Sequence, residues 1–385
     1  MAPTTRRLLI IPLALFVIGV LALTLWRAGG FAPSAARSNS TAPASPSDPT
    51  IASSSAPPSS ETSTTAVEPT TSTHRVLGVS IDGLNPQAIT SLGPTGAPTF
   101  YRLMREGAST LNARTAREQT RTLPNHTGML TGRRIDAHRG GHGVTFNSDK
   151  SRTTVHKAAG HYVASAFDVV HDQGGRTALF TAKEKFALYD RTWNLHGAPD
   201  EVGDDNGREK IDRFTVDTDN AELVTKLDGY LSADPGEFVF LHISLPDVTG
   251  HEYGFMGKRY LRAVQETDRL LGTVLDTITE SPSLRNGTVV LVTADHGGKG
   301  PSHSEAQKLQ NYRVPFFAWG SGIAAGHDLY DLNPSRQDPG DSRTTYGGPQ
   351  PIRNGELANI ATGLLGLPRV PGSEFDADQR LAVTG

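Results

Sequence analysis

Five short apolar runs, separated by segments of helical periodicity, constrain the fold of this chain more than any other feature. Each run is continuous rather than alternating and is rich in β-branched or aromatic residues, as expected of strands buried on both faces. Segments such as 97–107 and 259–278 have the spacing of amphipathic helices. We therefore predict a single α/β domain whose largely parallel central sheet is covered by helices on both faces. The apolar runs are residues 75–81, 176–182, 237–245, 287–294 and 313–320.

The N-terminal end of the chain has a different character. Arg6 and Arg7 precede nineteen uncharged, mostly apolar residues, 8–26, and a helix of that length spans about 28 Å, enough to cross a bilayer core. The basic residues on its N-terminal side predict that everything after Arg27 lies outside the cytoplasm. We interpret residues 1–27 as an uncleaved signal anchor, with a cleaved signal peptide as the alternative. Both interpretations export the remainder of the chain, which is then membrane-anchored or secreted.

Residues 28–73 are dominated by Ser, Thr, Ala and Pro. Such a segment has too little apolar surface to offset its chain entropy, which predicts a disordered linker. The globular domain then covers residues 74–385. All 13 histidines lie at or after His74, so we expect the chemistry of the protein in this domain.

Composition excludes several classes of site. The chain has no cysteine, which rules out a disulfide framework, a thiolate zinc finger and a cysteine nucleophile. Its formal net charge is −3, which argues against a nucleic-acid-binding surface that works by bulk electrostatics.

Acidic residues follow three of the predicted strands. Asp82 ends the first run, Asp247 follows the third with His251 four residues on, and Asp295-His296 ends the fourth. A single Asp at such a place more often caps a turn or a helix. Ligands of open α/β sheets bind beyond the carboxyl ends of the strands, however, and three carboxylates gathered there would repel one another unless cations lay between them. Asp and His ligands suit zinc, and also manganese or iron.

The segment Thr122-Leu123-Pro124-Asn125-His126 supplies a candidate nucleophile. Pro124 fits the first turn of a helix, which places Thr122 at a helix N-terminus, where backbone donors and the helix dipole stabilise an anion. The alternative is an ordinary threonine helix cap. A nucleophilic role would need a cation to lower the pKa of the hydroxyl, and the Asp/His cluster could hold one.

With these residues in place, the chain resembles the alkaline phosphatase superfamily, and most of all its type I phosphodiesterase/nucleotide pyrophosphatase branch. The resemblance covers nearly all of residues 75–385. VSIDGL is similar to the first metal-binding strand of the family, RTLPNHTGMLTG to its nucleophile motif, HGVTFN to its phosphoryl-contacting segment, and LPDVTGHEYG and TADHGG to its later ligand pairs. These motifs lie at 79–84, 121–132, 142–147, 245–254 and 293–298.

The resemblance implies an alkaline-phosphatase-like catalytic domain that hydrolyses phosphodiester or nucleotide pyrophosphate bonds of a small substrate. It implies a covalent phosphothreonine intermediate on Thr122, and a pocket for the developing charge made by Asn147 and the backbone N–H of Thr122. It also implies two divalent metal ions, with zinc as the expected metal. The implied ligands are Asp247, His251 and His303 for one ion, and Asp82, Asp295, His296 and the Thr122 oxygen for the other.

Some assignments stay open at this stage. His327 is an alternative to His303 as the last ligand, and we favour His303 because SHSEA precedes NYRVPFFAWG much as the ligand histidine precedes the last strand in relatives. The loop RRIDAHRGG carries extra residues, so the assignment of Asn147 depends on how that loop is aligned. Lys183 and Lys185 follow another strand, and we interpret them as a solvated helix start rather than as contacts to a substrate phosphate.

Other functions fit these residues less well than a diesterase does. A monoesterase usually adds a cationic group for the extra oxygen charge, and no lysine or arginine fills that role clearly in the sequence. A sulfatase would need Cys or Ser where Thr122 stands. A non-catalytic, surface-anchored binding domain would be expected to have lost a ligand or the nucleophile. We expect the region 140–215, with Phe146, Tyr189 and Trp193, to build much of the substrate pocket.

Overall fold

The computed structural model describes residues 73–195 and 207–385. The predicted membrane segment at 1–27 and all but the last residue of the predicted linker at 28–73 lie outside the described residues. None of the helices in the described stretches combines the length and the apolar character that crossing a bilayer requires.

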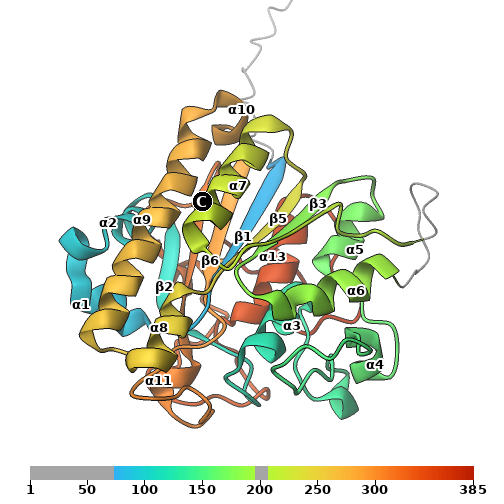
Figure 1. The fold of residues 1–385 in the computed structure, drawn as a ribbon, viewed down its shortest axis with the longest axis horizontal. Coiled ribbons are helices and arrows are strands. Elements are labelled where there is room, and N and C mark those ends of the chain that lie inside the picture. The colour runs from blue at the N-terminus through green and yellow to red at the C-terminus, as the bar shows by residue number, and fades with distance from the viewer. Residues whose placement is uncertain (1–72, 196–206) are drawn as a thin grey trace, which may run out of the picture. The chain divides into compact units, whose positions relative to one another are not determined.

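An eight-stranded sheet forms the centre of the described region (Figure 1). Its strand order is β4-β3-β5-β1-β6-β7-β2-β8. β7 runs antiparallel to both of its neighbours, and the other neighbouring pairs are parallel. The strands are β1 (Arg75–Ile81), β2 (Ala108–Arg114), β3 (Thr177–Thr181), β4 (Arg213–Val216), β5 (Phe238–Ile243), β6 (Thr288–Thr293), β7 (Arg313–Gly320) and β8 (His327–Asp328). The predicted α/β fold with a largely parallel sheet is confirmed.

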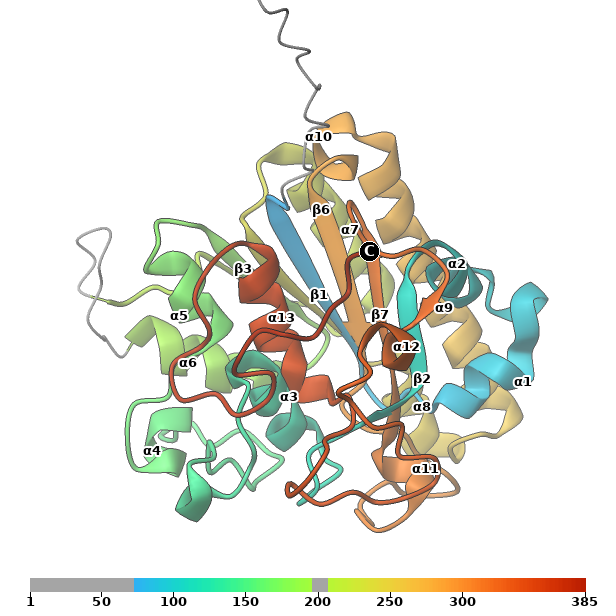
Figure 2. The same ribbon diagram turned by 180° about the vertical axis from the view of Figure 1, so that it is seen from behind.

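Helices cover both faces of this sheet. α7, α8, α9 and α10 lie over the face seen in Figure 1, and α3 and α13 lie over the opposite face (Figure 2). α7 packs on β3, and α13 packs on β1. The longer helices are α1 (Pro86–Gly96), α2 (Pro98–Glu106), α3 (Thr122–Thr131), α5 (Ala166–His171), α6 (Ala187–Leu195), α7 (Asn220–Ala233), α8 (Leu245–Tyr253), α9 (Lys258–Glu280) and α13 (Leu357–Leu364). Shorter ones are α4 (Val155–Ala159), α10 (Pro282–Arg285), α11 (Leu309–Tyr312), α12 (Leu329–Leu332), and the 3₁₀ turns η1 (Ala137–Arg139), η2 (Glu184–Phe186) and η3 (Asn354–Glu356).

Hydrophobic periodicity explains the longest helix. Along α9 the buried side chains recur three or four residues apart, among them Val264, Leu271, Val274 and Ile278. That spacing makes a single apolar stripe, and α9 uses it to pack against α7 and α8. The predicted segment 259–278 therefore lies within α9, as the segment 97–107 contains α2.

The pairing register brings the carboxyl ends of β1, β5 and β6 to one level. Ile81 at the end of β1 lies opposite Ile243 of β5, and Ser80 lies opposite Thr293 of β6. All three strands are buried along nearly their whole length. Whatever polar residues follow these strands must therefore meet at the same edge of the sheet.

Candidate metal centre

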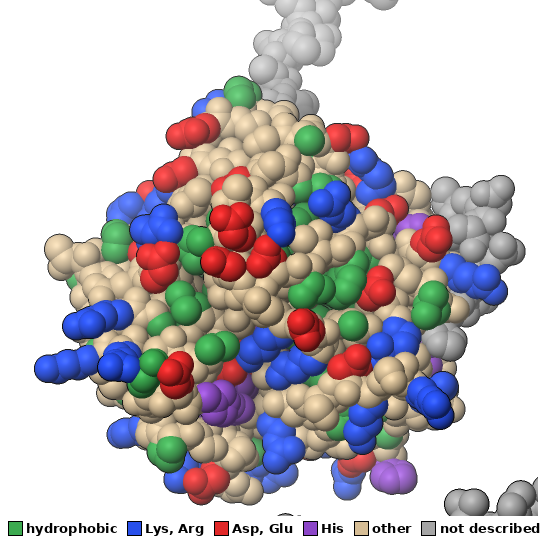
Figure 3. Space-filling view, viewed as in Figure 1, with side chains coloured by type: hydrophobic (Ala, Val, Ile, Leu, Met, Phe, Trp, Pro, Cys, Tyr) green, Lys and Arg blue, Asp and Glu red, His purple; other side chains and the backbone are tan. Residues whose placement is uncertain are grey.

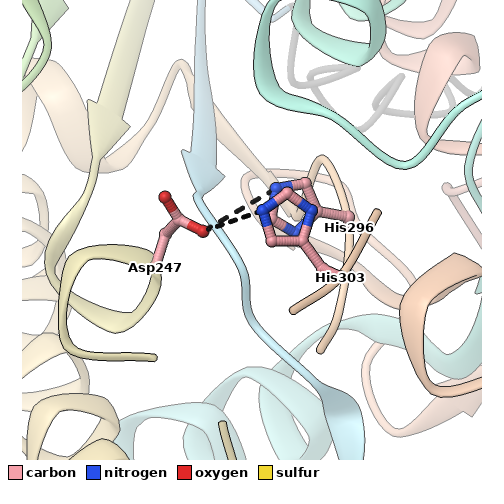
Figure 4. A group of neighbouring side chains, drawn as sticks. All are labelled: Asp247, His296 and His303. Atoms are coloured by element: carbon pink, nitrogen blue, oxygen red, sulfur yellow. Dashed lines mark ion pairs between the residues drawn. The ribbon is translucent and has the colours of Figure 1, made fainter. Parts of the chain in front are cut away.

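Three carboxylates meet at this edge. Asp82 follows β1, Asp247 lies in the first turn of α8 directly after β5, and Asp295 follows β6; all three are buried. Two groups of side chains have ligand atoms within 4.8 Å of one another: Asp82 with Asp295 and His296, and Asp247 with His296 and His303. Figure 4 shows the second group, in which both imidazole rings face the Asp247 carboxylate.

A tight backbone turn allows this convergence. Gly83, directly after Asp82, has a φ of +73°, and a Cβ there would lie 3.0 Å from the Cα of Asp247. Its N–H donates to Asp295 Oδ1 at 3.0 Å. Glycine is therefore needed here both for its conformation and for the close approach of three strand ends.

The first group has the spacing of a metal site. His296 Nε2 lies 3.4 Å from Asp82 Oδ1 and 3.2 Å from Asp295 Oδ2. Ligands held about 2.0–2.1 Å from a tetrahedral zinc ion are separated from one another by roughly 3.3 Å. The observed distances match that separation.

The resemblance implied another ligand set, Asp247 with His251 and His303, and this set has similar spacing. Asp247 Oδ1 lies 3.4 Å from His251 Nε2 and 3.5 Å from His303 Nε2, and the two imidazole nitrogens are 2.9 Å apart. His251 is half exposed, so this group faces the surface. In the space-filling view, histidine side chains are visible on the lower part of this face (Figure 3). His296 is also 3.9 Å from Asp247 Oδ1, so it lies between the two groups.

Four buried ligand atoms in this cluster have no hydrogen-bond partner among the residues that the structure describes: Asp82 Oδ1, Asp247 Oδ1, Asp295 Oδ2 and His296 Nε2. A buried polar atom without a partner costs about 1–3 kcal/mol. Four of them directed to one place are what a bound cation would satisfy. The donor set of carboxylates and imidazoles thus fits a divalent metal ion.

The other atoms of these side chains are fixed by the backbone. Asp295 Oδ1 accepts from the N–H groups of Gly83 and His296. His296 Nδ1 lies 2.8 Å from the carbonyl of Gly297, and His303 Nδ1 lies 2.6 Å from that of Thr120. An imidazole whose Nδ1–H donates to a carbonyl has Nε2 free to coordinate, which is the usual arrangement of metal-bound histidine.

Burial and mutual charge shift the ionisation of the cluster. Burial raises the pKa of Asp295 well above its usual range, and the charges of Asp82 and Asp247 add to the shift. Burial opposes the charge of Asp82 too, but Lys183 and a hydrogen bond from His242 bring its pKa well below the usual range. Burial also lowers the pKa of His296 well below the usual range, which keeps the ring neutral and able to coordinate.

Lys183 lies in this centre, and its interpretation as part of a solvated helix start is wrong. Its Nζ is 2.6 Å from Asp82 Oδ2 and 2.6 Å from Asp247 Oδ2, and the side chain is only 16% exposed. The reason is the strand order: β3 lies beside β5, so the residue that follows β3 reaches the same edge as Asp247. Lys185 also turns inward, with Nζ 3.4 Å from Asn147 Oδ1.

His242 is a second contact of Asp82 that the sequence analysis missed. It lies within β5, fully buried, with Nε2 3.1 Å from Asp82 Oδ2 and Nδ1 3.0 Å from the hydroxyl of Thr181. The available signal was a histidine inside an apolar run, because an imidazole in a strand buried on both faces needs a polar partner.

Thr122 begins α3 and is buried. The described part of the chain offers its hydroxyl no hydrogen-bond partner, so it does not act as an ordinary cap. Two contacts tie this helix start to the cluster: the Thr120 hydroxyl donates to the carbonyl of His303, and His126 Nδ1 lies 2.8 Å from the Thr122 carbonyl and 3.7 Å from Asp295 Oδ2. The start of α3 is thus fixed beside both ligand groups.

Asn147 lies against the same helix start. Its Oδ1 accepts from the N–H of Leu123 at 3.0 Å, which orients the amide. His327, the alternative last ligand, lies exposed in β8 and belongs to neither group of ligand atoms. The prediction for two of the pocket aromatics is wrong, because Tyr189 and Trp193 are fully buried in the hydrophobic core.

Comparison with known proteins gives the family. The sequence model described as "Type I phosphodiesterase / nucleotide pyrophosphatase" matches residues 76–313, more than half of the chain. Venom phosphodiesterase 2 of Crotalus adamanteus is 33% identical over 85 residues, which are 22% of this chain and 10% of that protein. GPI ethanolamine phosphate transferase 1 of Yarrowia lipolytica is 25% identical over 232 residues, 52% of this chain and 23% of that protein. The chain thus spans only a small part of these relatives.

Solved structures share the fold. An inactive variant of murine ectonucleotide pyrophosphatase/phosphodiesterase 5 in complex with AMP superposes with a TM-score of 0.57 at 14% identity, over 80% of this chain and 99% of that one. A 2-O GAG sulfatase superposes with a TM-score of 0.53 at 14% identity, over 77% and 71%. Both folds agree with the α/β architecture described above. The family match, which covers β1 to the start of β7, shows that this chain belongs to the type I phosphodiesterase/nucleotide pyrophosphatase family of phosphate-ester hydrolases.

Proposed function

We propose that this protein hydrolyses phosphate esters at two divalent metal ions, with Thr122 as the nucleophile. The observation that carries the proposal is the convergence of four unpartnered, buried ligand atoms beside the start of α3. Asp82, Asp295 and His296 would hold one ion. The second ion would be held by Asp247, His251 and His303.

Bound in these groups, zinc would lower the pKa of a nearby hydroxyl and neutralise charge on phosphoryl oxygens. The protein residues have separate tasks. The Thr122 oxygen would form a bond to phosphorus as the ester oxygen leaves, and water would then cleave the phosphothreonine. The backbone N–H of Thr122 and the side-chain NH2 of Asn147 would donate to the phosphoryl oxygens. His126, through its contact with the Thr122 carbonyl, would hold the first turn of α3 in place.

Phosphodiesters and nucleotide pyrophosphates are the substrate class named in the family description. The presence of AMP in the murine structure supports a nucleotide ester as one of the first substrates to test. Export is supported by the sequence of residues 1–27. We propose an extracytoplasmic domain tethered to the membrane by that segment.

A second candidate substrate class is the phosphomonoester. The sequence shows no clear cationic group for the additional charge of a monoester. In the structure, however, Lys183 and Lys185 both lie at the site, and such cations support this substrate class.

The covalent mechanism is tested by Thr122→Ala in the full-length, zinc-loaded protein. We expect kcat on bis-p-nitrophenyl phosphate to fall by about 10³-fold or more, because the nucleophile is removed. Metal content, measured by atomic emission, should remain, because the carboxylate and imidazole ligands are untouched. Thr225→Ala, an exposed threonine on α7, is the matched control. A Thr122→Ala protein with a tenth of the original rate would exclude the phosphothreonine intermediate.

A further inference from the structure

One ammonium group at the edge of the metal centre has no charged partner. Lys185 is partly buried, and its hydrogen bond within the described residues is a long one, 3.4 Å to Asn147 Oδ1. Among those residues it forms no ion pair. The same Asn147 oxygen accepts a shorter bond from the Leu123 N–H, so Lys185 is not needed to orient the amide.

Lys183, two residues away, is in the opposite situation. Its ammonium bridges the Oδ2 atoms of Asp82 and Asp247, and leaves the Oδ1 atoms of both carboxylates free for metal. Its role is to position these ligands. The ammonium of Lys183 is therefore already paired with carboxylates of the protein, whereas the ammonium of Lys185 can bind a ligand.

The surroundings of Lys185 favour an anion. Burial and the neighbouring charge of Lys183 lower its pKa, whereas the charges of Asp82, Asp295 and Asp247 oppose that shift. Its contact Asn147 is in turn bonded to Leu123, the second residue of α3, so Lys185 lies by the positive end of that helix.

We propose that Lys185 contacts the second ionised oxygen of a terminal phosphoryl group and so makes phosphomonoesters the preferred substrates. The inference rests on the proposed function and reverses the order of its two substrate classes. Near neutral pH a monoester carries nearly one more negative charge than a diester, on an oxygen that a diester blocks with carbon. A charge-assisted contact from a partly desolvated ammonium would stabilise that oxygen selectively.

The test compares two substrates with the same leaving group, p-nitrophenyl phosphate and methyl p-nitrophenyl phosphate, which differ only in one methylated oxygen. We expect the zinc-loaded, full-length protein to prefer the monoester in kcat/KM. Lys185→Met should lose about 30-fold or more on the monoester and less than about threefold on the methyl ester. Lys185→Arg should restore part of the preference for the monoester, since it restores the positive charge. Lys226→Met, which removes a lysine paired with Asp217 on the surface of α7, should leave the ratio unchanged.

Equal losses on both esters, or a native preference for the methyl ester, would overturn the proposal. Binding measurements distinguish failure of this proposal about Lys185 from failure of the proposed function. Inorganic phosphate and dimethyl phosphate are titrated calorimetrically into the zinc-loaded protein and into Lys185→Met. If neither ester is hydrolysed, the proposed function fails, but phosphate binding that weakens selectively in Lys185→Met still supports the subsite. Phosphate binding that is the same in both proteins overturns it.

Discussion

The two ends of the central strands carry charges in opposite circumstances. At the amino end, Arg75 at the start of β1 donates to the carbonyls of Pro235 and Gly236, and Arg176 before β3 pairs with Asp234 at 2.8 Å. The side chains of this pair are 46% and 80% exposed. At the carboxyl end of the central strands, the carboxylates are buried, and one oxygen of each has no hydrogen-bond partner within residues 73–195 and 207–385.

The difference separates charges that serve the surface from charges that serve a site. An exposed ion pair contributes about 0–1 kcal/mol to the free energy of unfolding, so its loss changes stability little. Three buried carboxylates with one lysine between them repel one another, and they destabilise a fold that holds no cation. An arrangement that opposes folding at one end of the sheet, while the other end is relaxed, marks the carboxyl end as the functional one.

Removing a carboxylate should produce the largest effect. It should lower the activity of the protein and raise the stability of its metal-free form. Asp295→Asn keeps an oxygen for the N–H groups of Gly83 and His296 but removes the ionisable carboxyl group beside Asp82 and Asp247. We expect at least about 10³-fold lower kcat/KM and reduced zinc content, because a ligand is lost. In EDTA the variant should melt at a higher temperature than the native protein, because repulsion is relieved. Asp234→Asn at the other end should change neither activity nor zinc content. A lower melting temperature of Asp295→Asn in EDTA would contradict the comparison.

Removing the bridging lysine should destabilise the metal-free protein. Lys183→Met leaves the buried Asp82 and Asp247 carboxylates without their ammonium, and we expect a loss of about 3–5 kcal/mol in the free energy of unfolding in EDTA. Zinc should reduce the loss, since it neutralises the same carboxylates. Urea unfolding with and without zinc measures both values. A loss of the same size in both conditions would show that Lys183 acts only through packing.

Glu356 in η3 tests a buried charge outside the two groups of metal ligands. Burial raises its pKa to about 7, although Arg336 lies 2.6 Å away and opposes the shift. Between the unfolded pKa, about 4.5, and pH 7 the folded protein binds more protons than the unfolded chain. The free energy of unfolding should therefore fall as pH rises through this range, by roughly 3 kcal/mol in total. Glu356→Gln should flatten that part of the profile, and an unchanged slope would contradict the assignment.

We expect the smallest loss of stability at the amino end of the central strands. Arg176→Ala removes the ion pair with Asp234, and we expect less than about 1 kcal/mol of lost stability and unchanged kcat/KM. High salt should reduce even this loss, because exposed pairs are screened. Thermal unfolding at low and high salt checks it. A loss above 2 kcal/mol would remove the contrast between the two ends.

Sequence patterns predicted the five strands that are most thoroughly buried, because such strands are continuous apolar runs. They missed β2, β4 and β8. β2 mixes polar and apolar residues in ASTLNAR, β4 is a short strand with no buried residue, and β8 has two residues. These strands lie at or near the two edges of the sheet, where burial no longer dictates composition.

The site was predictable where a residue's place depended on its own strand. Asp82, Asp247 and Asp295 each follow a recognisable strand, so their approach at one edge could be anticipated. Lys183 and His242 depend on which strands are neighbours, because β3 must lie beside β5 and β5 beside β1 for both to reach Asp82. Strand order arises from packing across the whole sheet and has no local signal in either segment.

The reciprocal bonds between Thr120 and His303 also bear on when the protein acquires activity. These residues are 183 positions apart, so the proposed nucleophile cannot be held in place until the chain has been made past His303. A growing chain that already contains β1 to β6 has its central strands but lacks this link and the ligand that His303 supplies. If Thr122 is the nucleophile, competence to cleave a phosphate ester cannot appear before His303 has been made and has folded back onto Thr120.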